Sequence, residues 1–333
     1  MSKATPYSPD RYERVPEGWF RRCGASGLNL PAISFGLWHN FGDEADAALA
    51  RRMCFEAFDL GITHFDLANN YGPAPGAAER RFATILKELP RDELIISTKA
   101  GYRMGPGPYG DGGSRKYLLS SIDASLRRLG LDYVDIFYHH RPDAATPLAE
   151  TLGALESALR SGKALYAGIS NYPGALTGEA VETGKKQGLS PLLIHQVSYS
   201  MFQRGPEHDL FPVTQQHGLG TICFCPLAQG MLTDRYLKGI PADSRAASKT
   251  GYLRPGGVKP QLVEKARHLE AIAKARGQSL AQMALAWVLR LPTVTSALIG
   301  ASRPEQIREN AAALKAAPFS REELEKIEAV LGG

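Results

Sequence analysis

The chain has 333 residues, of which 44% are hydrophobic and 22% charged, so it holds enough apolar material to build a core and is not expected to be disordered. Its 34 glycines and 22 prolines follow no three-residue period, which excludes a collagen-like protein and indicates many short elements separated by turns. The formal net charge is only +5 and is spread along the chain, which argues against a nucleic-acid-binding protein and favours local use of positive charge for anions such as phosphates.

Short apolar runs alternate with amphipathic stretches along the whole chain. The predicted strands are residues 32–38, 63–68, 94–99, 134–140, 164–170, 192–197, 221–226 and 296–300. Clear helical spacing between them occurs at residues 46–60, 77–89, 114–129, 148–161, 262–276 and 304–314. Boundary residues agree with these ranges, since serine and proline favour helix starts and glycine favours helix ends. The predicted caps and first-turn residues are Ser114, Ser302, Pro304, Gly61, Gly130, Gly162 and Gly277.

Eight strands alternating with helices over about 300 residues predict a (β/α)₈ barrel, the TIM-barrel fold. The competing fold, a doubly wound open sheet, usually carries a glycine-rich fingerprint in its first strand-to-helix turn, and the turn at residues 36–42 lacks one. Residues 21–30, with Gly24 and Gly27 at their centre, predict a β-hairpin that closes the bottom of the barrel. We therefore expect an N-terminal extension over residues 1–19 and a single barrel domain over residues 20–333.

Two patterns that resemble binding motifs are set aside. Residues 105–110 match G-x-G-x-x-G, but Pro106 and Pro108 lack the N–H groups that bind a pyrophosphate, and no helix opens directly on them. His139 and His140 are neighbours on a predicted strand, so their side chains point to opposite faces and cannot chelate one ion. We expect a flexible loop at the first pattern and no metal at the second.

The four cysteines, Cys23, Cys54, Cys223 and Cys225, contain no Cys-x-x-Cys spacing and are expected to be reduced thiols. The start of the chain lacks the apolar stretch of a signal peptide, and no run approaches 18 apolar residues. These patterns predict a cytoplasmic protein with no membrane-spanning segment.

Polar residues follow three successive predicted strands, where barrel enzymes carry their chemistry. They are Asp66 with the nearby Tyr71, Lys99, and His140. An Asp–Lys pair is often only a structural ion pair, and a single Tyr or His is often a core residue. At corresponding ends of consecutive strands, however, the four side chains are expected to converge on one mouth.

Together these side chains predict a site that donates a proton. Free tyrosine has a pKa near 10, whereas a general acid works best near the operating pH. A cation about 4 Å away at an effective dielectric of about 20 supplies roughly 4 kcal/mol toward closing that gap, and Lys99 is the candidate cation. Asp66 would keep Lys99 charged, because an unpaired buried charge is costly. Protonating an oxygen while another group attacks the carbon indicates carbonyl reduction, with hydride from a bound cofactor.

At these residues the chain resembles the aldo-keto reductases, whose tetrad is Asp, Tyr, Lys and His. The matching segments are residues 61–72, 95–99 and 133–142, and the resemblance extends over about residues 20–331. It implies a catalytic tetrad of Asp66, Tyr71, Lys99 and His140. His140 is preferred to His139 because the family's histidine lies two residues before a proline, here Pro142.

The resemblance also implies NADPH as the cofactor. Residues 168–172 and Gln196 look like the segment that holds the nicotinamide carboxamide, and Phe224 stands where relatives place a ring against the nicotinamide. Residues 225–230 look like a pyrophosphate loop, and residues 234–259 fit either a mobile clamp or a tolerated insertion. The cofactor-contacting residues expected are Trp38, Asp66, Ser170, Asn171, Gln196, Phe224, Cys225, Pro226, Leu227, Gln229, Gly230, Arg235, Arg245, Gly300, Ser302, Arg303, Gln306, Glu309 and Asn310.

Residues 299–310 look like the family's segment for the adenosine phosphate. Physical chemistry points the same way, because a glycine-led turn at a helix N-terminus favours an anion and Arg303 suits a 2′-phosphate. An ordinary serine-capped helix would show a similar pattern, so that interpretation stays open here.

Within the family, residues 138–143, 239–241 and 244–246 resemble the branch that contains potassium-channel β subunits and bacterial L-glyceraldehyde 3-phosphate reductases. Residues 36–42 and 107–111 resemble the bacterial reductases in particular. Channel subunits place Asn where His140 stands, so His140 favours an enzyme. Relatives in this branch are often tetramers or octamers, which implies a homo-oligomer.

The predicted activity is therefore NADPH-dependent reduction of small aldehydes, with L-glyceraldehyde 3-phosphate as the best candidate and methylglyoxal as a further substrate. The residues expected at the substrate mouth are Trp38, Tyr71, Tyr109, His140 and Arg141, with Tyr102 and Arg103 nearby. An arginine there would recognise a substrate phosphate. Two alternatives stay open: an NADPH-binding regulatory module with little turnover, like a channel β subunit, and a metal-dependent hydrolase on the same barrel. No nucleic acid or membrane is expected as a partner.

Overall fold

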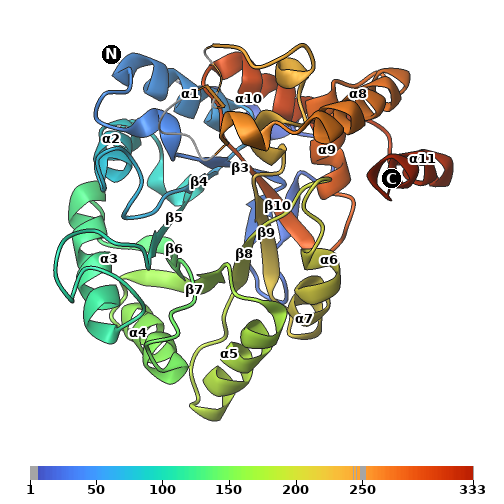
Figure 1. Cartoon of the computed structure of the whole chain (residues 1–333). Coiled ribbons are helices and arrows are strands. Elements are labelled where there is room, and N and C mark those ends of the chain that lie inside the picture. The colour runs from blue at the N-terminus through green and yellow to red at the C-terminus, as the bar shows by residue number, and fades with distance from the viewer. Residues whose placement is uncertain (1–6, 243, 245, 248–252, 333) are drawn as a thin grey trace.

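A computed structural model describes residues 7–242, 244, 246–247 and 253–332 (Figure 1). Eight parallel strands form a closed barrel in the order β10-β3-β4-β5-β6-β7-β8-β9, and helices surround it. The strands are β3 (Ile33–Gly36), β4 (His64–Asp66), β5 (Ile95–Ala100), β6 (Val134–His139), β7 (Ala164–Ser170), β8 (Ile194–Ser198), β9 (Gly220–Phe224) and β10 (Val294–Ile299). The predicted (β/α)₈ barrel is confirmed.

Each barrel strand packs one face against a ring of amphipathic helices and turns its other face to the barrel interior. The helices are α1 (Ala47–Asp59), α2 (Ala77–Leu86), α3 (Arg115–Leu129), α4 (Leu148–Arg160), α5 (Gly174–Lys186), α6 (Pro206–Asp209), α7 (Phe211–Gln216), α8 (Pro260–Ala275), α9 (Leu280–Val288), α10 (Pro304–Ala311) and α11 (Arg321–Gly332). The C-terminal helix α11 lies outside this ring, beside α8 (Figure 1).

The strand predictions differ from the structure mainly at their ends. The run at residues 164–170 matches β7, whereas the run at 221–226 was too long because Cys225 adopts a left-handed φ of 54° that no strand allows. The predicted strand at 32–38 is also too long. The observed strand β3 ends at Gly36, and the backbone of Trp38 adopts a helical conformation. The last strand begins at Val294, two residues before the predicted start.

Helix capping follows the sequence signals in most places. The Ser114 hydroxyl accepts a hydrogen bond from the Tyr117 amide at the start of α3, and Gly130 ends that helix with a φ of 67°. The predicted cap at Ser302 is wrong, because Arg303 occupies the cap position of α10. Ser302 instead donates its backbone N–H to Gln306 Oε1 at 2.8 Å. Pro304 is the first residue of α10, as predicted.

The predicted hairpin is confirmed, with β1 (Phe20–Arg22) antiparallel to β2 (Asn29–Pro31). Its turn is fixed to the amino-terminal start of β9 by a hydrogen bond from the Ala25 amide to the Gly218 carbonyl. Cys23 and Leu30 of the hairpin are fully buried and pack with apolar residues such as Leu193 of the barrel floor. The amino-terminal end of the barrel is therefore closed by apolar packing, which leaves the carboxyl end for a site.

The described part of the predicted extension packs on the barrel through Arg11, which is buried against Tyr7, Tyr12 and Phe58 and pairs with Glu93. The division into residues 1–19 and 20–333 stays a prediction. None of the helices formed by the described residues has the length and apolar character needed to span a bilayer.

Candidate functional site

Three of the predicted site residues meet at the carboxyl ends of β4 and β5. Lys99 Nζ donates hydrogen bonds to Asp66 Oδ2 and to the Leu67 carbonyl, each at 2.6 Å, and lies 3.3 Å from the Tyr71 hydroxyl. Parallel pairing of β4 with β5 places the two strand ends at the same edge, which brings these side chains together. The convergence expected from the sequence is thus present in the structure.

The electrostatics of this group are dominated by a buried ion pair. The side chains of Asp66 and Lys99 are both fully buried. Burial lowers the pKa of the Lys99 ammonium, and the Asp66 carboxylate opposes that shift by favouring the charged form. A buried charge without a partner would cost several kcal/mol, so each ion depends on the other. The Tyr71 hydroxyl therefore has a desolvated cation as its neighbour.

His140 completes the cluster from the residue that follows β6 (Val134–His139). Its ring meets the Tyr71 ring edge-on at 5.9 Å and the Tyr102 ring edge-on at 4.6 Å. Burial lowers the pKa of His140 well below its usual range, and the nearby Lys99 cation adds to that shift. His140 is therefore neutral at pH 7, with one ring nitrogen able to donate a hydrogen bond and one able to accept.

His139 points away from this cluster, as strand alternation predicts. Its Nδ1 lies 2.6 Å from the Tyr172 hydroxyl, and its ring packs under the backbone of Gly113. The described residues contain no group of three or more His, Cys, Asp or Glu side chains placed to hold a metal.

Two further side chains hold Asp66 from other strands. Ser97 Oγ donates to Asp66 Oδ1 at 2.7 Å, and Gln196 Nε2 donates to the same oxygen at 3.1 Å. Sequence reasoning missed Ser97, although it lies two residues before Lys99 on one strand and so faces the same side. Gln196 was expected beside the nicotinamide carboxamide, and in the structure its amide group is anchored on Asp66.

The aromatic and basic residues predicted at the mouth have distinct surroundings. Trp38 stacks on Tyr71 with ring centroids 5.7 Å apart. Arg141 donates to the Gly101 carbonyl and pairs with Asp111, both at 2.9 Å, and its guanidinium lies over the Tyr102 ring. Arg141 therefore ties down the loop at residues 101–113. Tyr109 is 65% exposed beside Lys116, and Arg103 is also exposed.

The residues expected to hold the nicotinamide lie next to the tetrad. Asn171, directly after β7, has a φ of 62° and donates through Nδ2 to the His140 carbonyl and to Ser170 Oγ, both at 3.0 Å. Phe224 ends β9 and is half-buried. These positions form one continuous edge along the ends of β7, β8 and β9.

The segment after β9 has an unusual backbone. Cys225, Ala228 and Gln229 all have positive φ, between 47° and 58°, a conformation that costs free energy for residues other than glycine. Gly230 follows with a φ of 97°. Such strain is concentrated at functional turns, which agrees with the expected phosphate loop. The other predicted members of this loop are Pro226, which is buried, and Leu227 and Arg235, which are half-buried, while Arg245 lies outside the described residues.

The last predicted group surrounds the N-terminus of α10. Gly300, Ser302 and Arg303 are exposed there, and Gln306 accepts from Ser302. An exposed arginine at the start of a helix fits a phosphate chemically. Further along the helix, Glu309 is exposed with its carbonyl bonded to Gln282, and Asn310 is buried.

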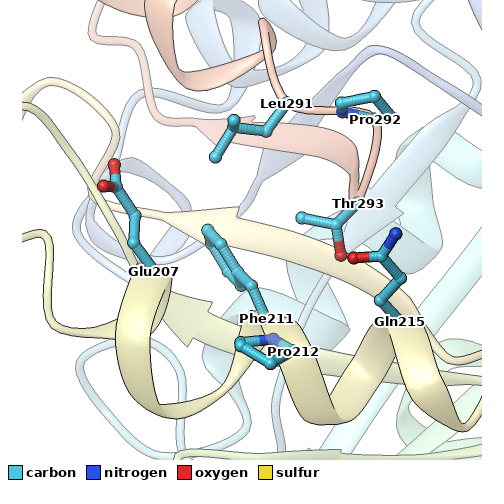
Figure 2. Close-up of a pocket in the computed structure, with 7 residues that line it drawn as sticks. All are labelled: Glu207, Phe211, Pro212, Gln215, Leu291, Pro292 and Thr293. Carbon is cyan, nitrogen blue, oxygen red and sulfur yellow. The ribbon is translucent and has the colours of Figure 1, made fainter.

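A surface pocket of about 260 Å³ lies elsewhere, between α6, α7 and the loop before β10 (Figure 2). Its lining residues are Glu207, Phe211, Pro212, Gln215, Leu291, Pro292 and Thr293. None of them belongs to the predicted site, and Glu207 is already engaged by Arg204, Arg290 and Tyr199. The pocket is therefore separate from the tetrad.

Comparison with known proteins agrees with the geometry. The family model for the aldo/keto reductase family matches residues 32–331. The chain is 53% identical over 330 residues to L-glyceraldehyde 3-phosphate reductase of Escherichia coli, covering 96% of this chain and 94% of that protein. It is 37% identical over 318 residues to a probable voltage-gated potassium channel subunit beta of Arabidopsis thaliana, covering 94% and 96% of the two chains. The chain is an oxidoreductase and belongs to the aldo/keto reductase family.

Proposed function

We propose that this protein reduces small aldehydes with NADPH, that L-glyceraldehyde 3-phosphate is its main substrate and methylglyoxal a further one, and that Tyr71 is the general acid. The observation that carries the proposal is the distance of 3.3 Å between Lys99 Nζ and the Tyr71 hydroxyl. Lys99 is held there by its fully buried ion pair with Asp66. The similarity to the L-glyceraldehyde 3-phosphate reductase of Escherichia coli supports the choice of substrate.

The roles of the four residues follow from their chemistry. NADPH, when bound, supplies the hydride. The Tyr71 hydroxyl donates a proton to the carbonyl oxygen, and Lys99 stabilises the tyrosinate left behind through its charge. Asp66 keeps Lys99 charged and in place. His140, neutral because of its burial, donates a hydrogen bond that orients the carbonyl oxygen.

Enzymes of this family generally use NAD(P)H, and we assign NADPH because of Arg303. An exposed guanidinium at the N-terminus of α10 suits the 2′-phosphate that NADH lacks. Arg235 and Arg245 are assigned to the pyrophosphate, and Ser170 and Asn171 to the carboxamide. Gln196 Nε2 donates one proton to Asp66, so the side-chain carbonyl and the second amide proton of Gln196 are left for the nicotinamide carboxamide.

A regulatory module with little turnover is the second candidate, because the chain is also 37% identical to probable channel β subunits. His140 argues against it, since it supplies the fourth member of an enzymatic tetrad. We further propose that the protein is cytoplasmic. We also propose that it forms a tetramer or octamer, and light scattering on the purified protein tests this oligomeric state.

The deciding experiment follows NADPH consumption by the purified protein with L- and D-glyceraldehyde 3-phosphate and methylglyoxal. The same panel is repeated with NADH. The proposal expects turnover with a higher kcat/KM for the L-isomer and for NADPH. Tight NADPH binding without turnover of any short aldehyde would instead establish the regulatory module.

A further inference from the structure

A line of buried polar groups runs beneath the tetrad and ends at Asp66. Ser296 of β10 lies 2.6 Å from Ser34 of β3, and Ser34 Oγ lies 2.8 Å from His64 Nδ1 on β4. His64 Nε2 lies 3.0 Å from Ser97 Oγ on β5, which donates to Asp66 Oδ1 at 2.7 Å. All five side chains are fully buried. The line crosses four neighbouring strands of the barrel.

Counting donors fixes the direction of every hydrogen bond in this line. Asp66 pairs with Lys99 and is therefore an ionised acceptor, so the single hydroxyl proton of Ser97 points to Asp66. Ser97 must then accept from a proton on His64 Nε2. A neutral imidazole carries only one ring proton, so His64 Nδ1 accepts from Ser34.

The same counting extends to the start of the line. Because the hydroxyl proton of Ser34 is used on His64, Ser34 accepts from Ser296. Every donor from Ser296 onward therefore points toward the Asp66 carboxylate. Aligned hydrogen bonds polarise one another in a low-dielectric interior, so the whole line favours negative charge at Asp66.

The neutral state of His64 agrees with this direction. Burial lowers the pKa of His64 to about 4; the Lys99 cation adds to that shift, and the Asp66 carboxylate opposes it. A protonated His64 would carry a second ring proton and reverse the bond to Ser34. Lys99 on β5 is the charged group that acts on both Asp66 and His64, and Tyr138 on β6 also faces Asp66. Glu79 on α2 and His140 lie further out and act on Lys99 or are acted on by it.

We infer that Ser97 and His64 are positioning residues of the tetrad, which hold the Asp66 carboxylate ionised and aimed at Lys99 through a one-way line of donors. The inference rests on the proposed reductase function for its effect on catalysis. The direction of the line is a property of the chain itself and does not depend on turnover.

The kinetic test replaces Ser97 by alanine, which removes one donor from Asp66. A hydrogen bond to a charged group predicts about a tenfold loss of kcat for L-glyceraldehyde 3-phosphate, with KM changed less than about threefold. Ser97→Thr keeps the hydroxyl and should restore kcat.

Thr221→Val is the matched control, since Thr221 is also a buried strand residue whose hydroxyl is bonded, but to Thr214 and away from Asp66. It should leave both kcat and KM unchanged. An active wild type whose Ser97→Ala variant keeps the wild-type kcat would overturn the inference alone. A wild type with no aldehyde turnover would overturn the proposed function and the catalytic effect together.

A second measurement needs neither turnover nor a stable Ser97→Ala variant. Nitrogen-15 NMR of the histidine rings, assigned with His64→Gln, reports the tautomer of His64 in the wild-type protein. The one-way line requires the neutral Nε2–H form, retained down to about pH 5 because the pKa of His64 is lowered to about 4. The Nδ1–H form, or a charged ring at pH 6, would contradict the inferred direction.

Discussion

The surroundings of Asp66 and the rim at α10 differ in how far the chain satisfies its own polar groups. Asp66 accepts hydrogen bonds from Lys99, Ser97 and Gln196, and all four side chains are buried. At the rim, which is formed by Gly300, Ser302 and Arg303, the Arg303 side chain is exposed, and its guanidinium makes no hydrogen bond or ion pair with any other residue that the structure describes. One region is complete within the protein, and the other presents groups to solvent.

This difference matches two different tasks. Groups that act on a transition state must already be fixed, because reorganising dipoles during the reaction would cost part of the rate gain. A group that anchors a phosphate can stay solvated until the phosphate arrives, at little cost in stability. Substitutions in the interior should therefore affect kcat or folding, and substitutions at the rim should affect cofactor affinity.

The largest effect is expected from Tyr71→Phe. Loss of the general acid should lower kcat about 1000-fold, within the range that proton transfer contributes. The Kd for NADPH should change less than about twofold, because the phenyl ring can keep the stacking on Trp38. Steady-state kinetics and fluorescence titration with NADPH measure the two quantities. A kcat within threefold of wild type would remove Tyr71 from the acid role.

The interior should also make folding sensitive to acid. Burial lowers the pKa of His64 and of His139 to about 4 and that of His195 to about 3, so all three are neutral in the folded protein. The unfolded chain takes up these protons as the pH falls below about 6.5, so the free energy of unfolding decreases from there down to about pH 4.

Each of these histidines should remove about 1.4 kcal/mol from the free energy of unfolding between pH 7.5 and 5.5. Urea unfolding at the two pH values measures the change. His195→Gln keeps a donor for the Tyr172 carbonyl and should make the pH dependence shallower, whereas substitution of the exposed His268 should not. Equal slopes for both variants would show that His195 is not buried in its neutral form.

The sequence was most informative where strand geometry alone decides position. The ends of parallel strands meet at one edge, so Asp66, Lys99 and His140 were correctly expected to converge. The outline of the barrel was predictable for the same reason, because its strands are apolar runs bounded by glycine and polar residues. Strand ends were less certain, since residues such as Cys225 adopt a left-handed conformation that their side chains do not favour.

Contacts between distant loops could not be predicted. Arg141 was expected to meet a substrate phosphate, but its pairing with Asp111 depends on how the loop at residues 101–113 folds back over β6. The spacing of Ser97 from Lys99 indicates that it faces the same side of its strand, but it does not indicate which groups the Ser97 hydroxyl contacts. Its role becomes visible only when His64 and Asp66 are seen on either side of it.

The rim should respond to Arg303→Ala with a change in affinity. Loss of one charge-assisted contact predicts about a tenfold increase in the Kd for NADPH, with kcat at saturating NADPH unchanged. The Kd for NADH should stay the same, because NADH lacks the 2′-phosphate. Arg321→Ala, at an exposed arginine on α11, is the control for lost positive charge. Equal weakening of both cofactors would exclude a 2′-phosphate contact.

The smallest effect is expected at Asp111, which is neither buried like Asp66 nor, like the Arg303 guanidinium, free of a partner among the described residues. Its carboxylate pairs with Arg141 at 2.9 Å, and both side chains are about two-fifths exposed. Asp111→Asn weakens this pairing and leaves Arg141 freer to meet a substrate phosphate. The KM for L-glyceraldehyde 3-phosphate should therefore fall about twofold, since exposed ion pairs contribute only about 0.2–1 kcal/mol.

Methylglyoxal carries no phosphate, so its KM should not change in the same variant. Asp123→Asn, which breaks an ion pair of similar exposure with Lys163, controls for a general loss of negative charge. If Asp111→Asn changes the KM of both aldehydes alike, the pair only holds the loop in place. A fall in KM for L-glyceraldehyde 3-phosphate alone means that Asp111 pairs with Arg141 until the substrate phosphate replaces it. Arg141 would then resemble Arg303 at the rim, because both would bind a phosphate that comes from solution.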